Sequence, residues 1–109
     1  MILIEGTTIK IIRGDTARIQ IEILDAHGDP YVLAEGDSVR FAMKKNYYQP
    51  NPDLLKTIPN DTLVLQFNPE DTKPFAFGQY KYDIELTTAA GDVDTFIDRA
   101  DFYILEEVH

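Results

Sequence analysis

The chain of 109 residues contains no cysteine and no tryptophan, and it has only two histidines. The absence of cysteine excludes a disulfide bond, a thiolate metal site and a thiol nucleophile. Basic residues are also scarce, because 10 Lys and Arg stand against 19 Asp and Glu, giving a formal net charge of −9. Nucleic acids are bound mainly through Lys and Arg, so this balance predicts that nucleic acid is not a partner.

Long hydrophobic runs are missing too, and none approaches the roughly 20 apolar residues that a membrane span needs. The first six residues lack the basic start of a secretion signal, so we expect synthesis in the cytoplasm and no membrane partner. What the chain does have is 44% hydrophobic residues, with six Phe and six Tyr. This content is enough for one core, and we expect a single domain over residues 1–109.

The clearest pattern in the chain lies at residues 78–88. Tyr80, Tyr82, Ile84 and Leu86 alternate with polar residues there, which predicts a half-buried strand of an antiparallel sheet. Similar alternation, or a short run of strand-forming residues, predicts further strands at 8–13, 17–23, 31–33, 39–44, 54–58, 63–67, 93–97 and 101–106.

Only one helical turn is expected, at residues 69–73. Asn68 is suited to the N-cap, Pro69 to the first helical position, and two acidic residues follow in the first turn. Pro74 ends the turn. One such turn among roughly seven to nine short strands predicts an all-β protein, either a sandwich or a barrel.

The spacing of Gly78, Tyr80 and Tyr82 favours an immunoglobulin-like antiparallel β-sandwich. In that fold a tyrosine near the start of the sixth main strand hydrogen-bonds back to nearby backbone, and a core cysteine often follows two residues later. Tyr82 then takes the cysteine position, opposite an aliphatic residue such as Ile21, and Phe41 takes the place of the core tryptophan. The alternative is that Tyr80 and Tyr82 are ordinary core aromatics of another antiparallel fold.

Five stretches carry a resemblance to a known family: Arg13-Gly14-Asp15-Thr16, residues 25–33, Val39-Arg40-Phe41, residues 68–72 and residues 78–86. Together they resemble small immunoglobulin-like proteins and domains of tailed bacteriophages and prophages, including the N-terminal domain of siphophage baseplate upper proteins. The resemblance implies a non-enzymatic structural protein of the virion. It would assemble with other tail or baseplate proteins, or with copies of itself, and need no cofactor.

Tyr47 and Tyr48 are the candidate residues for protein contact. They lie in the irregular, proline-containing segment 45–53, where exposed aromatics supply rigid apolar area at low entropic cost. The alternative placement is that one of them folds over the end of the sandwich as a lid on the core. The alternative function is a carbohydrate-binding or adhesion module at a cell surface, which would show two or three aromatics in one exposed row.

No set of residues predicts catalysis or a metal site, so we expect neither. His27 lies in a turn between Asp25 and Asp29 and is interpreted as a solvated turn residue, since the other histidine is the distant His109. A calcium site with carboxylate ligands is the alternative for four aspartates that lack EF-hand spacing, Asp92, Asp94, Asp98 and Asp101.

Two further motifs each have a functional and a structural interpretation. Arg13-Gly14-Asp15 resembles an integrin-binding motif, but its position predicts a turn at the end of a strand. Four apolar residues fall on the outward face of their predicted strands and form either an oligomer contact or a surface covered by loops: Ile12, Val64, Tyr103 and Leu105.

Overall fold

The computed structural model describes residues 2–5, 7–23 and 27–106, with side chains described from residue 7 onward except at position 96. Within these ranges the chain is all-β, with eight strands in two sheets and one short helix, as predicted. The larger sheet contains β1 (Ile2–Glu5), β2 (Thr8–Ile12), β4 (Ser38–Lys44), β5 (Leu54–Ile58), β7 (Gly78–Thr87) and β8 (Val93–Leu105). The smaller sheet contains β3 (Ala17–Gln20) and β6 (Val64–Phe67).

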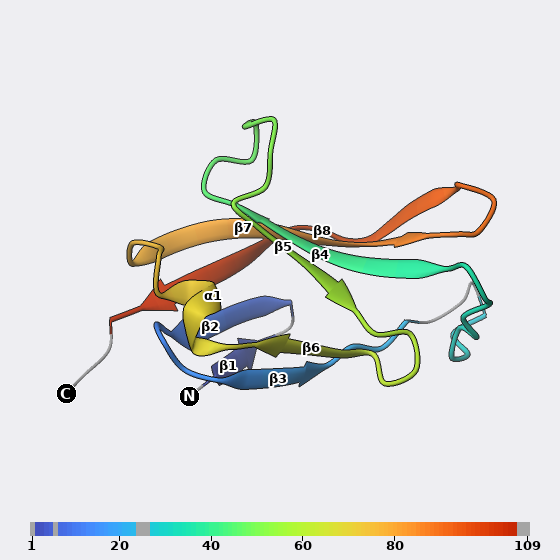
Figure 1. Ribbon diagram of the computed structural model, residues 1–109, viewed down its shortest axis with the longest axis horizontal. Coiled ribbons are helices and arrows are strands. Elements are labelled where there is room, and N and C mark those ends of the chain that lie inside the picture. Colours follow the sequence, from blue (N-terminus) through green and yellow to red (C-terminus); the bar gives the residue numbers. More distant parts are fainter. Residues whose placement is uncertain (1, 6, 24–26, 107–109) are drawn as a thin grey trace.

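The order of strands in the larger sheet is β1-β2-β8-β7-β4-β5. Every neighbouring pair is antiparallel except β2 and β8, which run parallel, and β3 pairs with β6 antiparallel. In Figure 1, β3 and β6 lie below β4, β5, β7 and β8, while β2 and β1 of the larger sheet lie low, beside β3 and β6. The two sheets form a sandwich because each has one apolar face, and the two apolar faces bury each other.

Three phenylalanines join the two sheets at the centre of the core. Phe41 of β4, Phe67 of β6 and Phe102 of β8 are all fully buried. The ring of Phe67 lies 5.3 Å from that of Phe41 and 5.5 Å from that of Phe102. These edge and tilted arrangements are the favoured ones for aromatic pairs, so the rings hold the sheets in one relative position.

The strand with the clearest alternation has one buried face, as its pattern predicts, and it occupies a central position in the larger sheet. β7 lies between β8 and β4, and Tyr80, Tyr82, Ile84 and Leu86 are each at most 4% exposed. The residues that alternate with them stay partly or fully exposed on the other face: Gln79, Lys81, Asp83 and Glu85. A central strand with one apolar face therefore supplies core residues along its whole length.

Four predicted strands differ from the structure. The short strand at 31–33 is wrong: the structure has an isolated bridge at Pro30, and the Tyr31 N–H donates to the Ile23 carbonyl at 2.8 Å. Pro30 has no N–H to donate, which opposes a longer ladder. The strands at 93–97 and 101–106 are one strand, β8, which continues through an irregularity at Arg99. The strand at 17–23 is shorter, and after Gln20 the pairing continues only as a bond from Ile21 N–H to Leu63 O.

The predicted helical turn is α1 (Pro69–Thr72). The Asp71 carboxylate accepts a hydrogen bond from the Asn68 backbone N–H at 2.7 Å, which satisfies one of the free donors at the helix start. Thr72 is fully buried, and its hydroxyl oxygen accepts a bond from the Gly14 N–H at 2.8 Å. The turn is thereby attached to the connection between β2 and β3.

Candidate functional site

The segment between β4 and β5, residues 45–53, stands away from both sheets in Figure 1 and is called the tyrosine loop below. Hydrogen bonds within the loop fix its shape. The Lys45 N–H donates to the Asp53 carboxylate at 2.7 Å, Asn46 and Gln49 exchange two bonds at 3.0 Å, and the Tyr48 N–H donates to the Asn46 side chain at 3.1 Å. These bonds fix the backbone that carries the two tyrosines.

The two tyrosines of the loop have different environments. Tyr48 is 88% exposed. Tyr47 is half-buried, its hydroxyl lies 3.2 Å from an Asp98 carboxylate oxygen, and its ring lies 4.6 Å from the Arg99 guanidinium and 5.8 Å from the Lys44 amine. Tyr47 thus rests on β8 and not on the core, so the lid placement does not describe it.

Arg99 and Asp98 reach Tyr47 because β8 contains a bulge. Asp83 of β7 faces both residues, and the register of the two strands shifts at this point. Arg99 has a φ of +53°, and its N–H donates to the Asp83 carboxylate at 2.6 Å, which stabilises this left-handed conformation. The side-chain hydrogen bond with Tyr47, followed by nearby negative charge, raises the pKa of the Arg99 guanidinium.

The predicted corner residues lie at the start of β7, beside the tyrosine loop. The Tyr80 hydroxyl donates to the Ala76 carbonyl at 2.8 Å, the bond that the corner hypothesis requires. Gly78 has a φ of +140°, and the Lys45 amine donates to the Gln79 carbonyl at 3.2 Å while lying 4.7 Å from the Tyr80 ring. Lys45 therefore links the corner to the loop.

The environments of the corner and core tyrosines favour their neutral forms. Burial, and then the nearby Asp53 carboxylate, raise the pKa of Tyr80. Burial also raises the pKa of Tyr82 to about 12, and the Tyr82 hydroxyl donates to the Thr7 carbonyl. The Tyr82 ring lies 5.3 Å from Phe41, so the two residues assigned to cysteine and tryptophan positions are in contact.

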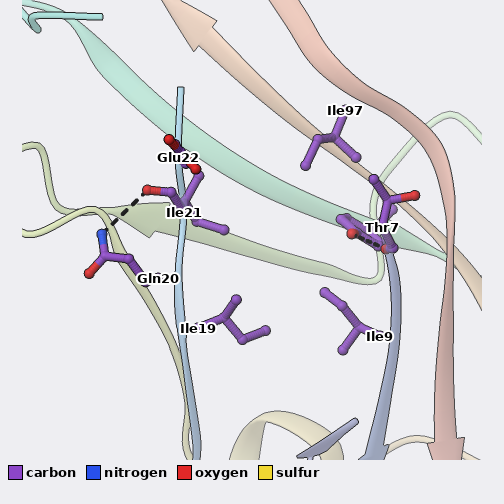
Figure 2. Close-up of a pocket in the computed structure, with 8 residues that line it drawn as sticks. Thr7, Ile9, Ile19, Gln20, Ile21, Glu22 and Ile97 are labelled. Carbon is purple, nitrogen blue, oxygen red and sulfur yellow. Dashed lines mark hydrogen bonds between the residues drawn. The ribbon is translucent and has the colours of Figure 1, made fainter. Parts of the chain in front are cut away.

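A cavity of about 170 Å³ opens between β2 and β3 (Figure 2). Its walls are mainly apolar, with Ile9 on one side, Ile19 and Ile21 on the other, and Tyr82 and Ile97 from the larger sheet. Ile21 and Tyr82, which the sequence places opposite each other, both line it. No feature of the sequence pattern predicts the cavity, because it depends on which edges of the two sheets stay apart.

The remaining candidates do not gather into a chemical site. His27 is exposed in a turn, while Asp25 and His109 lie outside the described residues. Asp101 forms an ion pair with Lys81, whose hydrogen bond lowers the pKa of that carboxyl. In the described ranges, no three His, Asp or Glu side chains lie in a group that could hold a metal ion.

The Arg13-Gly14-Asp15 motif forms the turn between β2 and β3. Gly14 has a φ of +86°, and the Asp15 N–H donates to the Ile12 carbonyl at 3.1 Å. The Arg13 guanidinium lies 4.8 Å from the Phe77 ring. Bonds to α1 and packing on Phe77 hold the motif in place at the end of the strand.

The four outward apolar residues do not form one surface. Ile12 and Leu105 are register partners on β2 and β8, and Tyr103 lies two residues from Leu105. Val64 belongs to β6 in the other sheet. Three of the four residues are therefore neighbours, and all are half-buried.

Comparisons of the chain with protein-family models, curated proteins and solved structures find no match. In the part of the chain that the structure describes, no helix has the length and apolarity to cross a membrane. The fold and the site together define an all-β protein of two facing sheets with a hydrogen-bonded aromatic loop. Its function must be argued from that loop.

Proposed function

We propose that this protein is a non-enzymatic structural or assembly protein of a phage or prophage tail or baseplate, which binds its partners through the tyrosine loop. The observation that carries the proposal is Tyr48, an aromatic side chain 88% exposed on a loop whose own hydrogen bonds fix it. A loop backbone that is fixed before binding loses little conformational entropy in a complex, and tyrosine is enriched at energetically dominant interface positions.

Two features support an immunoglobulin-like type of sandwich, the fold of the family that the sequence resembles. The neighbouring strands β8, β7, β4 and β5 match the G-F-C-C′ order of that fold, and the β3–β6 pair matches B and E. The bond from the Tyr80 hydroxyl to the Ala76 carbonyl has the form of a tyrosine corner.

The geometry of the two rings favours protein contact over the carbohydrate-binding alternative. The rings of Tyr47 and Tyr48 lie 6.0 Å apart at an angle of 81°. They do not form one flat exposed row, and the Tyr47 face is already in contact with Arg99. What remains accessible is one protruding ring flanked by polar groups, which suits insertion into a pocket of another protein.

The genetic neighbourhood tests the phage assignment. We expect the reading frames on either side to encode tape-measure, portal or tail-fibre proteins, and each product then becomes a partner to co-express. Neighbours encoding metabolic or secreted glycan-active proteins would contradict the assignment, because the fold would then be shared without the function.

A further inference from the structure

The two lateral openings of the sandwich are protected differently. On the side of β5 and β6, Lys56 points inward from β5, forms an ion pair with Asp71 of α1, and lies 5.7 Å from the Phe67 ring. An inward charge on an edge strand opposes pairing with another chain, and α1 lies between the upper and lower strands at one end of β6 in Figure 1. This side is therefore closed.

The opposite side, between β2 and β3, contains the apolar cavity (Figure 2). β3 belongs to a sheet of two strands and lies at the lower margin of the molecule in Figure 1. Only one of its edges is hydrogen-bonded to another strand in the described chain, namely to β6. Ile19 and Ile21 are each 8% exposed, whereas core residues such as Phe41 and Ile84 are fully buried.

The backbone of β3 is oriented for pairing at this edge. The Ile21 N–H donates to Leu63 O, and Ile19 is the register partner of Leu65 on β6. Backbone groups alternate in direction along an antiparallel strand, so Arg18, Gln20 and Glu22 direct their N–H and C=O groups away from β6. Residues 17–23 contain no proline and no inward charge that would oppose pairing.

We propose that β3 pairs antiparallel with β3 of a second copy, about a two-fold axis at Gln20. In that register Arg18 lies opposite the partner's Glu22, and Glu22 lies opposite the partner's Arg18. Opposite charges directly across an antiparallel pair stabilise it. Arg18, Gln20 and Glu22, whose backbone groups point to the free edge, are the residues that form hydrogen-bonded pairs with the second copy in this register. The exposed row of β3 is thus complementary to itself, which identifies the occupant as this same chain.

The product is a continuous four-stranded sheet, β6-β3-β3-β6, with a closed two-fold interface. The isoleucines of each copy cover the edge of the other copy's cavity, which removes apolar surface from water. This dimer does not involve Tyr47 or Tyr48 and stands without the phage assignment. It leaves the tyrosine loops free, because they lie on the opposite side of the molecule from β3 (Figure 1).

A charge exchange tests the register. Sedimentation velocity of the full chain, up to about 1 mM, measures dimerisation of the wild type, Arg18→Glu and Glu22→Arg. Both side chains are exposed, so the folded monomer tolerates the changes. We expect a dimeric wild type and at least a tenfold rise in the dimer dissociation constant for each variant, since like charges then face each other. An equimolar mixture of the two variants restores opposite charges at both positions and dimerises.

The double variant R18E/E22R restores both pairs within one chain and regains the wild-type dissociation constant. Gln20→Pro keeps the β3–β6 ladder, because the Gln20 N–H points away from β6, but it removes a donor at the centre of the proposed pair and abolishes the dimer. Circular dichroism establishes that each variant is folded. A monomeric wild type, or single variants that dimerise like the wild type, would overturn the proposal whatever the outcome of experiments on Tyr48.

Discussion

Tyr80 combines two roles at the start of β7. Its ring is 4% exposed and its hydroxyl reaches back four residues to the Ala76 carbonyl. Phe75 packs on the same ring, with centroids 6.0 Å apart. The side chain therefore fixes the path by which the chain leaves α1 and enters the larger sheet.

Tyr80→Phe keeps the packed ring and removes only the hydrogen bond. We expect a loss of roughly 1 kcal/mol in the free energy of unfolding, because a partly buried carbonyl loses its donor. The midpoint of urea unfolding measures the loss. Tyr48→Phe is the control: the Tyr48 side chain is 88% exposed, so we expect this variant to keep the wild-type midpoint of urea unfolding. Equal midpoints for Tyr80→Phe and the wild type would show that the corner bond contributes nothing.

Tyr82 makes stability depend on pH in the alkaline range. Burial raises the pKa of its phenol to about 12 in the folded chain, against roughly 10 in the unfolded chain. Between these values the unfolded state releases the proton and the folded state keeps it, so the free energy of unfolding falls as pH rises. The contribution of Tyr82 to the free energy of unfolding is complete below the pKa of the unfolded chain, and it is lost as pH rises through the pKa of the folded chain.

Tyr82→Phe removes this titration. We expect the stability difference between wild type and variant to narrow as pH rises from about 10 to about 12, since only the wild type then has a phenol at position 82 to ionise. Urea unfolding at a series of pH values measures both proteins. A difference that stays constant over this range would contradict a raised pKa.

Among the elements, the junction of α1, the corner and β7 is the most constrained. Gly78 has a φ of +140°, and a Cβ added there would lie 3.0 Å from the Lys45 amine. Gly28 also has a positive φ, +83°, but a Cβ there would meet nothing within 4 Å. The two glycines therefore differ both in φ and in contact with the tyrosine loop.

Gly78→Ala is expected to cost more than about 1 kcal/mol and to cost more than Gly28→Ala, because alanine is strained at positive φ and Lys45 must also move. Thermal and urea unfolding give both values. Equal losses at the two positions would contradict the additional constraint assigned to Gly78.

Alternation of apolar and polar residues is sufficient to predict β4 and β7, because one face of each strand is buried. It does not predict β1, which is four residues long and has no polar alternation. The environment of Tyr47 cannot be predicted from the pattern either, because its partner Asp98 lies 51 residues later in the sequence. The bulge that turns Arg99 toward Tyr47 has no glycine or asparagine to mark its positive φ.

At the scale of the whole molecule, the two proposed contact surfaces lie on different sides. The chain is elongated, with extents of 45 × 28 × 22 Å, and the tyrosine loop and the free edge of β3 lie at opposite margins in Figure 1. A dimer through β3 presents two tyrosine loops at once. A bivalent protein binds a repeated partner, such as a ring of tail subunits, more tightly than either loop alone.

The central claim is that Tyr48 provides the main contact with a tail or baseplate partner. Isothermal titration of the wild type and Tyr48→Ala, against the neighbouring gene product that the wild type binds, tests it most directly. Val32→Ala is the matched control, because Val32 is 85% exposed but lies outside the tyrosine loop. We predict that Tyr48→Ala raises the Kd about 30-fold or more, as an interface residue that dominates binding does. The unfolding midpoint of Tyr48→Ala and the Kd of Val32→Ala are expected to remain at the wild-type values. Equal affinities for all three proteins would contradict the account.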